Sequence, residues 1–407
     1  MIRLDRGMAY DVARVRDLYP ALRGDTVWLD GAAGTQSPSS VIDAIAGAYR
    51  TGTSNGGGAF EASARADGYV DAARAAVADL VGAHDPRGVV LGPNMTTLTY
   101  RIGQALSDRW QPGDNVVVSR LDHDANIRPW VQLAERSGTD VRWAEIDVDT
   151  GELPSAQYAD LVDERTRLVA VTAASNVLGT RPDVRAIADL AHAVGALAYV
   201  DGVHATAHGV VDVGELGSDL YATSSYKWDG PHVGCVIARP ELLESLRPMK
   251  LASSSDDVPD RFEWGTPSYP NLAGVAAAVD HLAALDAGAS GTRRERLVTS
   301  LNASEENESA LFGRMLSALE ADDRVTSYGS AKHRTATAYF RIDGETPEVT
   351  ATRLAAAGVN VWHGHNYAWE VTGALGIRET GSAVRASLAH YSNDADVDRF
   401  LDVTLGS

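Results

Sequence analysis

Leu168-Val-Ala-Val171 and Ala196-Leu-Ala-Tyr-Val200, the latter followed by Asp201, are the stretches on which the fold assignment rests. Each is a short apolar run, and the residues around them have helical character. The same rhythm recurs between residues 86 and 240, with further runs at 88–91, 115–118, 141–144 and 233–237. Strands that alternate with helices form a largely parallel sheet with helices on both faces. The sequence therefore predicts an α/β fold.

Helical and strand patterns outside this region suggest a second unit. Long helices are expected over residues 62–82, 271–287 and 294–321, and strands over 335–342 and 383–389. Further helices are expected near residues 348–357 and from Asp394 onward. We therefore expect residues 26–290 to form a large domain and residues 291–407 a smaller α+β domain, with residues 1–25 as an N-terminal segment of the small domain.

Charge and cysteine content limit the possible partners and compartments. The 55 acidic and 36 basic residues give a formal charge of −19, which repels nucleic-acid phosphates and anionic lipid. The single cysteine, Cys235, excludes an internal disulfide framework and fits a reducing compartment. No signal peptide and no long uncharged apolar run are evident in the sequence. A cytoplasmic protein without nucleic-acid or membrane partners is expected.

Polar residues follow several of the predicted strands. Asp201, Asn176 and the segment 94–97 each come after a strand, and ligands of parallel sheets gather at the strands' carboxyl ends. Further along, Lys227 closes the hydroxyl-rich run Ser224-Ser-Tyr-Lys-Trp228. A lysine amine can hold the aldehyde of pyridoxal phosphate (PLP) as a Schiff base, while a carboxylate keeps its pyridine nitrogen protonated. Lys227 and Asp201 together predict a PLP site.

Several motifs between about residues 27 and 403 support this interpretation. They are Trp28-Leu-Asp-Gly-Ala-Ala33, Leu121-Asp-His-Asp-Ala-Asn126, Ser175-Asn-Val-Leu-Gly179, Val200-Asp-Gly202, the Lys227 loop, Arg261-Phe-Glu-Trp-Gly-Thr-Pro267 and Val384-Arg-Ala-Ser-Leu-Ala-His-Tyr391. This set resembles the class V aminotransferase group, which includes the cysteine desulfurases. The resemblance implies PLP fold type I, with a seven-stranded type of sheet.

Three residues would act at the cofactor ring according to this resemblance. Lys227 would attach the cofactor and later move a proton at the substrate Cα. Asp201 would pair with the pyridinium nitrogen, and His123 would stack on the ring. The alternatives are a surface lysine, a helix-capping aspartate and a capping or solvent-exposed histidine.

The resemblance also implies a phosphate site at a helix N-terminus, where backbone N–H groups and the dipole favour an anion. Its members would be Asn94, Met95, Thr96, Ser224 and Tyr226, although the family often has histidine in place of Tyr226. Thr266 would reach the phosphate of the neighbouring subunit. A homodimer is therefore expected.

Other residues would face the phenolic oxygen of the cofactor and the substrate. Asn176 and His204 would lie near that oxygen. Many relatives carry glutamine at the position of His204; an imidazole can still donate a hydrogen bond there, but its charge would depend on pH. Arg385 would bind the α-carboxylate of an amino acid substrate through a bidentate fork, the alternative being a surface arginine.

One position departs from the cysteine desulfurases, which need a mobile cysteine to accept sulfur. Tyr367 stands at the position of that thiol, and Cys235 lies in a predicted strand. Tyr367 and His365, with Trp362 and His363 in the same loop, are candidate substrate contacts, and ordinary loop packing is the alternative.

These observations predict a PLP-dependent lyase that cleaves the C–S bond of cysteine or an S-substituted cysteine without a catalytic cysteine. An epimerase and an aminotransferase would use the same residues and differ in the fate of one proton. A non-catalytic scaffold of the same fold is the other class. No metal site is expected, since the pairs His204/His208 and His363/His365 have no third ligand in a motif.

Overall fold

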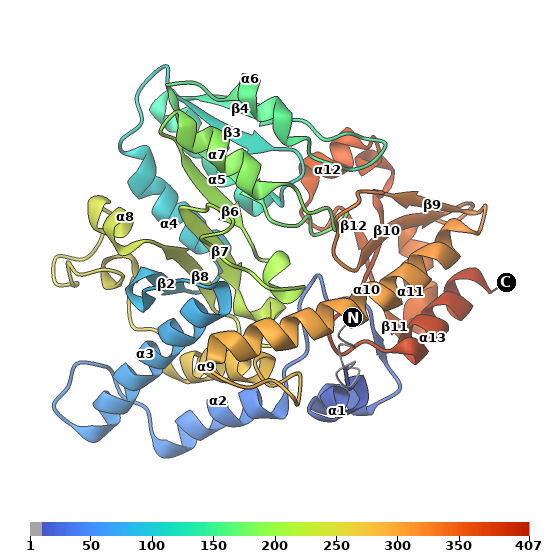
Figure 1. Ribbon diagram of the computed structural model, residues 1–407, viewed down its shortest axis with the longest axis horizontal. Helices are drawn as coiled ribbons and strands as arrows, with labels where there is room; N and C mark the ends of the chain where they lie inside the picture. The colour runs from blue at the N-terminus through green and yellow to red at the C-terminus, as the bar shows by residue number, and fades with distance from the viewer. Residues whose placement is uncertain (1–9, 407) are drawn as a thin grey trace, which may run out of the picture.

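The computed structural model describes residues 10–406, which contain a large seven-stranded sheet and a smaller four-stranded one (Figure 1). The strand order of the large sheet is β2-β8-β7-β6-β5-β3-β4. Its strands are β2 (Val89–Gly92), β3 (Asn115–Ser119), β4 (Asp140–Ala144), β5 (Thr166–Thr172), β6 (Leu197–Asp201), β7 (Leu220–Ser224) and β8 (Gly234–Ala238). The α/β fold with a mostly parallel sheet is confirmed.

Strands β7 and β8 differ from what the sequence suggested. Strand β7 was not predicted from the sequence, although it lies inside the sheet between β6 and β8. β8 runs antiparallel to both β7 and β2, whereas β7, β6, β5, β3 and β4 are parallel. The loop between β7 and β8 therefore turns back at the carboxyl edge of the parallel strands and carries Lys227 there.

Helices cover both faces of the large sheet, since alternate strand residues enter two different cores. Val117 packs in one core with helices α3 (Glu61–Val81), α7 (Val184–Ala193) and α9 (Tyr269–Leu282). Its neighbour Val116 packs in the other with α4 (Met95–Ser107), α5 (Arg128–Ser137) and α8 (Pro240–Ser245). The short helix α6 (Tyr158–Leu161) precedes β5. This alternation is typical of a sheet that is buried on both sides.

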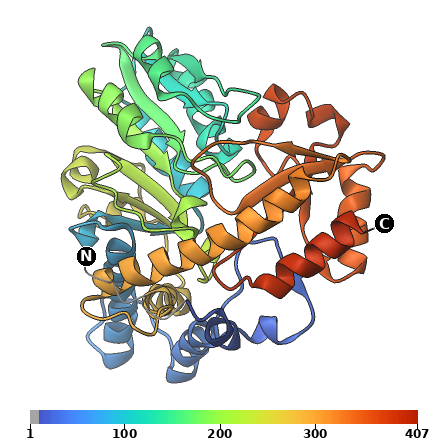
Figure 2. The ribbon, with the colours of Figure 1, turned by 45° about the vertical axis from the view of Figure 1, so that its right-hand side comes forward.

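The long helix α10 (Arg293–Glu320) leads from the large sheet to the smaller one and runs beside α13 (Asp394–Leu405) (Figure 2). The small sheet has the order β12-β13-β10-β9, formed by β9 (Val325–Tyr328), β10 (Thr337–Ile342), β12 (Trp362–Gly364) and β13 (Ala383–Ser387). Helices α11 (Pro347–Ala356) and α12 (Trp369–Ala374) complete this part. A domain boundary after residue 290 stays a prediction.

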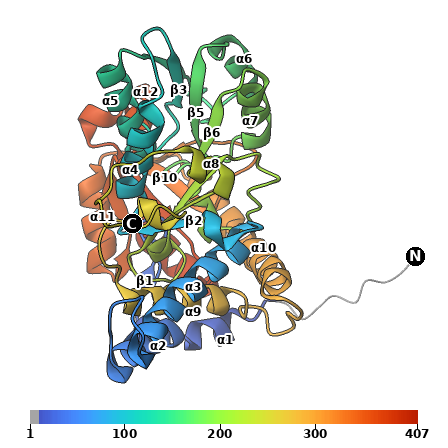
Figure 3. The same ribbon diagram turned by 90° about the vertical axis from the view of Figure 1, so that its left-hand side faces the viewer.

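The N-terminal part of the described chain contacts elements that lie beside each of the two sheets. Strand β1 (Val27–Trp28) pairs with β11 (Val359–Asn360), and Arg16 of α1 (Val12–Asp17) forms an ion pair of 2.7 Å with Asp396. Helix α2 (Ser39–Thr51) packs against α9, which also packs against α3, below the large sheet (Figure 3). Among the described residues, no helix combines the length and the apolar character needed to cross a membrane.

Candidate active site

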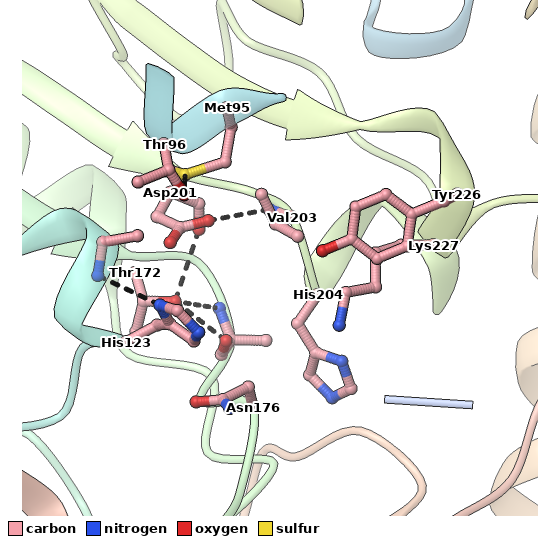
Figure 4. A pocket seen from close by; sticks show the side chains of 12 residues that line it. Met95, Thr96, His123, Thr172, Asn176, Asp201, Val203, His204, Tyr226 and Lys227 are labelled. Atoms are coloured by element: carbon pink, nitrogen blue, oxygen red, sulfur yellow. Dashed lines mark hydrogen bonds between the residues drawn. The ribbon is translucent and has the colours of Figure 1, made fainter. Parts of the chain in front are cut away.

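Two adjoining cavities lie at the carboxyl edge of the parallel strands. The inner one is lined by Met95, Thr96, His123, Ala125, Thr172, Ala174, Asn176, Asp201, Val203, His204, Tyr226 and Lys227 (Figure 4). Six of these residues also line an outer cleft of about 920 Å³, which adds Arg385, His365, Tyr367 and Asn94. Most of the residues predicted from the sequence therefore meet at one place, whereas Ser224 and Thr266 line neither cavity.

Lys227 and Asp201 face the same inner cavity. Lys227 ends a short 3₁₀ turn after β7, and its Nζ donates a hydrogen bond to the carbonyl oxygen of Ala32. Burial, reinforced by the charge of Arg385, lowers the pKa of Lys227 to about 7. Asp201 is the last residue of β6, and burial raises its pKa to about 6. At neutral pH much of the lysine is an unprotonated amine, the form that reacts with an aldehyde.

His123 caps a turn and also lines the candidate site. Its Nδ1 accepts the backbone N–H of Ala125 at 3.0 Å, so it caps the turn that follows. The imidazole also lines both cavities. Burial, with the nearby charges of Lys227 and Arg385, lowers its pKa to about 3. The ring is therefore neutral, and its proton lies on Nε2 because Nδ1 accepts a bond.

The start of α4 forms the upper edge of the inner cavity. The Asn94 side chain accepts the N–H of Thr97 at 2.9 Å, and the N–H of Met95 donates to Ser224 Oγ at 3.0 Å. Ser224 thus supports the helix start from behind. A Cβ at Gly234 would lie 2.2 Å from the carbonyl carbon of Asn94, so glycine permits this close approach of β8. The first turn of the helix leaves N–H groups without acceptors inside the helix, which suits an anion at this edge.

Asn176 and His204 lie on the other side of the inner cavity. Asn176 Nδ2 donates to the carbonyl oxygen of Asn366 at 2.8 Å, while its buried Oδ1 has no partner among the described residues. His204 Nε2 lies 3.0 Å from Thr335 Oγ1 and 3.1 Å from Thr337 Oγ1. Burial keeps the pKa of His204 well below 6.5, so the imidazole is neutral. The charge change considered for His204 is therefore not expected near neutral pH.

Arg385 extends from β13 into the outer cleft and is 4% exposed. Its Nη1 donates to the carbonyl oxygen of Asn176 at 3.0 Å, and its Nε has no partner among the described residues. Burial lowers its pKa to about 10, which leaves it charged at neutral pH. A buried guanidinium with unused N–H groups suits a carboxylate ligand.

Tyr226 also lies between the cavities, where its ring stacks on His232 with centroids 4.7 Å apart. Thr266 is exposed in the loop before α9. Trp362 and His363 lie in β12 and line the outer cleft beside His365 and Tyr367. Trp362 is 50% exposed and Tyr367 68% exposed, so both rings are open to a ligand.

Asp30, for which no role was predicted, lies close enough to Lys227 and Arg385 to feel their charges. Burial raises the pKa of Asp30 to about 6, although both of these cations lower it. Its Oδ1 is buried without a partner among the described residues. Asp30 belongs to the motif at residues 28–33, but that motif does not indicate what its aspartate does.

A buried hydrogen-bond network around Asp229, two residues beyond Lys227, was also missed. The hydroxyl of Tyr19 donates to Asp229 Oδ2 at 2.8 Å and lies 2.7 Å from Nε2 of both His281 and His390. His390 Nε2 is 3.1 Å from Asp229 Oδ2. Asp229 has a φ of 71°, a left-handed conformation that is uncommon for a residue other than glycine. We name these four residues the Asp229 network; it fixes the end of the lysine loop.

The residues present fit a PLP molecule. The inner cavity combines a reactive amine, a buried carboxylate, a neutral imidazole, an unpartnered amide oxygen and a helix N-terminus. These groups match an aldehyde, a protonated pyridine nitrogen, an aromatic ring, a phenolic hydroxyl group and a phosphate, respectively.

Comparison with known proteins agrees with this arrangement. The family Aminotransferase class-V matches residues 27–400. An uncharacterized protein of Mycobacterium tuberculosis is 38% identical over 97% of this chain and 98% of its own length. A cysteine desulfurase of Dickeya dadantii is 33% identical over 96% of this chain and 95% of its own. The crystal structure of the cysteine desulfurase CsdA from Escherichia coli is similar with a TM-score of 0.86 and 28% identity, over 97% of this chain and 98% of that one.

The chain belongs to the class-V aminotransferase family of PLP-dependent enzymes. This confirms the resemblance stated from the motifs, and the fold agrees with that of the cysteine desulfurase structures. The roles of individual residues remain proposals.

Proposed function

We propose that this protein is a PLP-dependent lyase that cleaves the Cβ–S bond of cysteine or an S-substituted cysteine. The observation that carries the proposal is that Lys227, Asp201 and Arg385 surround connected cavities, whereas Cys235 lies fully buried in β8. The similarity to cysteine desulfurases supports chemistry at a cysteine Cβ. The absence of any other cysteine from the sequence argues against sulfur transfer to a protein thiol.

Each proposed role follows from the position of the side chain. Bound PLP withdraws electrons from the bonds at Cα of an attached amino acid. Lys227 Nζ would take the proton from the substrate Cα. Asp201 keeps the pyridine nitrogen protonated, and Arg385 holds the substrate carboxylate in the outer cleft. Asn176 Oδ1 accepts the phenolic hydroxyl, and the start of α4 holds the phosphate.

The overall reaction balances without an oxidant or reductant. Loss of the Cα proton and rupture of the Cβ–S bond release a thiol, which leaves with one proton. Water then completes the conversion of the remaining three-carbon unit to pyruvate and ammonia. For an S-substituted cysteine, the sum is substrate plus water giving pyruvate, ammonia and the thiol.

One assay separates this reaction from its alternatives. The holoenzyme is incubated with cysteine, cystine and S-alkyl cysteines, and pyruvate, released thiol or sulfide, and optical purity are measured. Pyruvate and thiol in equal amounts support the lyase. Racemised substrate without pyruvate would show an epimerase, and keto acid with aminated cofactor an aminotransferase. A protein that never binds PLP would be a scaffold.

Two variants control this assay. Lys227→Ala should abolish pyruvate formation because it removes the amine that takes the Cα proton. Cys235→Ala should leave turnover unchanged. Burial raises the pKa of the Cys235 thiol, so this side chain stays protonated and unreactive in the core. Loss of turnover in Cys235→Ala with full retention of fold would contradict release of sulfur without a protein thiol.

We also propose that the enzyme acts as a homodimer in which Thr266 reaches the phosphate site of the neighbouring subunit. In support, Thr266 is exposed and lies outside the cavities of its own chain. Its hydroxyl could donate a hydrogen bond to a phosphate oxygen. Light scattering should give the mass of two chains, and Thr266→Val should weaken PLP binding without changing that mass.

A further inference from the structure

The segment from Gly364 to Glu370 borders the outer cleft and is tied to the large domain. The backbone N–H of Asp124 donates to the carbonyl oxygen of Tyr367 at 2.8 Å. Asn176 Nδ2 donates to the carbonyl oxygen of Asn366, also at 2.8 Å. Both donors lie in loops that follow strands of the large sheet. The tip of the segment is therefore attached to that sheet by its main chain.

Ion pairs hold the end of the same segment. Glu370 Oε2 lies 2.8 Å from Arg120 Nη1, and Glu370 Oε1 lies 3.0 Å from Arg128 Nη2. The Glu370 side chain is only 15% exposed, so solvent screens these pairs less than fully exposed ones. Two separate arginines on the large domain thus fix the segment where α12 begins.

The backbone conformation at the tip depends on these attachments. Asn366 has a φ of 48° and Tyr367 a φ of 58°, so two consecutive residues other than glycine are left-handed. Such a conformation costs free energy at a tyrosine and persists only where surrounding contacts hold it. The contacts present the Tyr367 side chain to the cleft in one orientation.

That orientation places Tyr367 against His123. The two rings stack with centroids 5.3 Å apart and an interplanar angle of 28°. Tyr367 lines only the outer cleft, whereas His123 lines both cavities. The backbone N–H of Ala125 already binds Nδ1 of His123. The stacked tyrosine ring is a second constraint on the plane of the imidazole.

We propose that Tyr367 is a positioning residue for His123 and that segment 364–370 is a fixed wall of the substrate cleft. The proposal rests on the proposed function, since it assigns a static role to the position where a sulfur-accepting enzyme needs a mobile thiol. Tyr367 holds the imidazole in the plane that stacks on the cofactor ring. Sulfur from the substrate then leaves through the cleft as a free thiol.

The test measures His123 rather than turnover. We would record imidazole ¹H–¹⁵N spectra of the apoprotein from pH 4 to 8 and assign His123 from the spectrum of His123→Gln. Tyr367→Asn removes the ring but keeps a residue that tolerates a positive φ, so the segment should still fold. Tyr367→Phe retains the stacking ring, and Trp362→Ala removes another ring from the same cleft.

In Tyr367→Asn, water should reach the imidazole and raise the His123 pKa by at least one unit, so that titration becomes visible above pH 4. Tyr367→Phe and Trp362→Ala should leave His123 neutral throughout this range. Identical His123 titration in the wild type and in Tyr367→Asn would overturn the positioning role. An equal rise in Trp362→Ala would also overturn it, since any ring of the cleft would then suffice.

Amide hydrogen exchange of the holoenzyme tests the fixed wall. The peptide covering residues 364–370 should be protected for minutes or longer, and Glu370→Gln should accelerate its exchange at least tenfold. Exchange in the wild type at the rate of an unstructured peptide would overturn the fixed wall. Neither measurement uses turnover, so both can succeed even if the pyruvate assay rejects the lyase, and the pyruvate assay can succeed if both fail.

Discussion

Replacing Asp229 by asparagine should destabilise the protein in a way that depends on pH. Asp229 is fully buried, accepts the Tyr19 hydroxyl and pairs with His390. Asparagine is nearly the same size and can still accept the hydroxyl, so the variant removes mainly the charge. Removing one partner of a buried ion pair costs about 3–5 kcal/mol. Because the hydroxyl bond survives, we expect the lower limit, about 3 kcal/mol.

The sign of the pH dependence follows from the two shifted pKa values. Burial alone would lower the pKa of His390, but Asp229 outweighs it, and the Glu308 charge adds to the rise above 6.5. Stability from His390 is therefore present below pH 6.5 and is lost as pH rises through its raised pKa. Burial alone would raise the pKa of Asp229, but His390 and His281 lower it below 3.8. Stability from Asp229 is present above pH 3.8 and is lost as pH falls through the lowered pKa.

The destabilisation by Asp229→Asn should thus be greatest between about pH 4 and 6.5 and become smaller in more alkaline solution. Thermal unfolding followed by circular dichroism at pH 5.5 should show a Tm lower by roughly 6–12 °C, taking the value of about 2–4 °C per kcal/mol that holds for domains of about 150–250 residues. Asp398→Asn, which removes a partner from an exposed pair with Arg314, should change Tm little. A decrease in Tm that is the same at pH 5.5 and 9 would refute the ion pair, and no decrease at pH 5.5 would refute the whole account.

The remaining predictions concern the active site. The rate at which apoprotein captures PLP should rise with pH through about 7, because the pKa of Lys227 lies there and only the unprotonated amine attacks an aldehyde; stopped-flow absorbance would show it, and a flat profile would contradict it. Asp201→Asn should retain coloured cofactor but lose roughly 100-fold or more in kcat, since it removes a preorganised charge; wild-type kcat would mean that the carboxylate has another role. Arg385→Ala should raise KM for an amino acid by roughly 10–100-fold, the effect of a lost charged hydrogen bond, and leave KM for the corresponding decarboxylated amine nearly unchanged; equal increases would exclude a carboxylate clamp.

The sheet could be predicted where a strand contains a long apolar run. Strand β5 contains the run Leu168-Val-Ala-Val171, whereas β7 is Leu-Tyr-Ala-Thr-Ser, which ends in two polar residues and has one β-branched residue. Its burial between β6 and β8 comes from tertiary packing, which overrides a weak local preference. Once β7 is recognised, the antiparallel direction of β8 can be predicted from the length of the loop between them. Residues 225–233 are too few for the crossover of about a dozen residues that a parallel pair requires.

The active site shows a similar limit. Lys227 and Asp201 could be paired because an amine and a carboxylate suit two different atoms of one PLP molecule, and Asp201 was expected at the carboxyl end of a parallel strand. The Asp229 network could not be predicted, because Tyr19 precedes the first strand, His281 lies in α9 and His390 follows β13. Nothing in their local sequence indicates that these residues meet. The same holds for the stacking of Tyr367 on His123, which depends on how the two sheets are placed.

The Asp229 network also sets an order of events during biosynthesis. Tyr19 is translated before the lysine loop, and His390 is translated after it. A nascent chain therefore holds the lysine loop without its full set of hydrogen-bond partners until His390 has been translated. We expect the enzyme to acquire its working geometry only after His390 has left the ribosome.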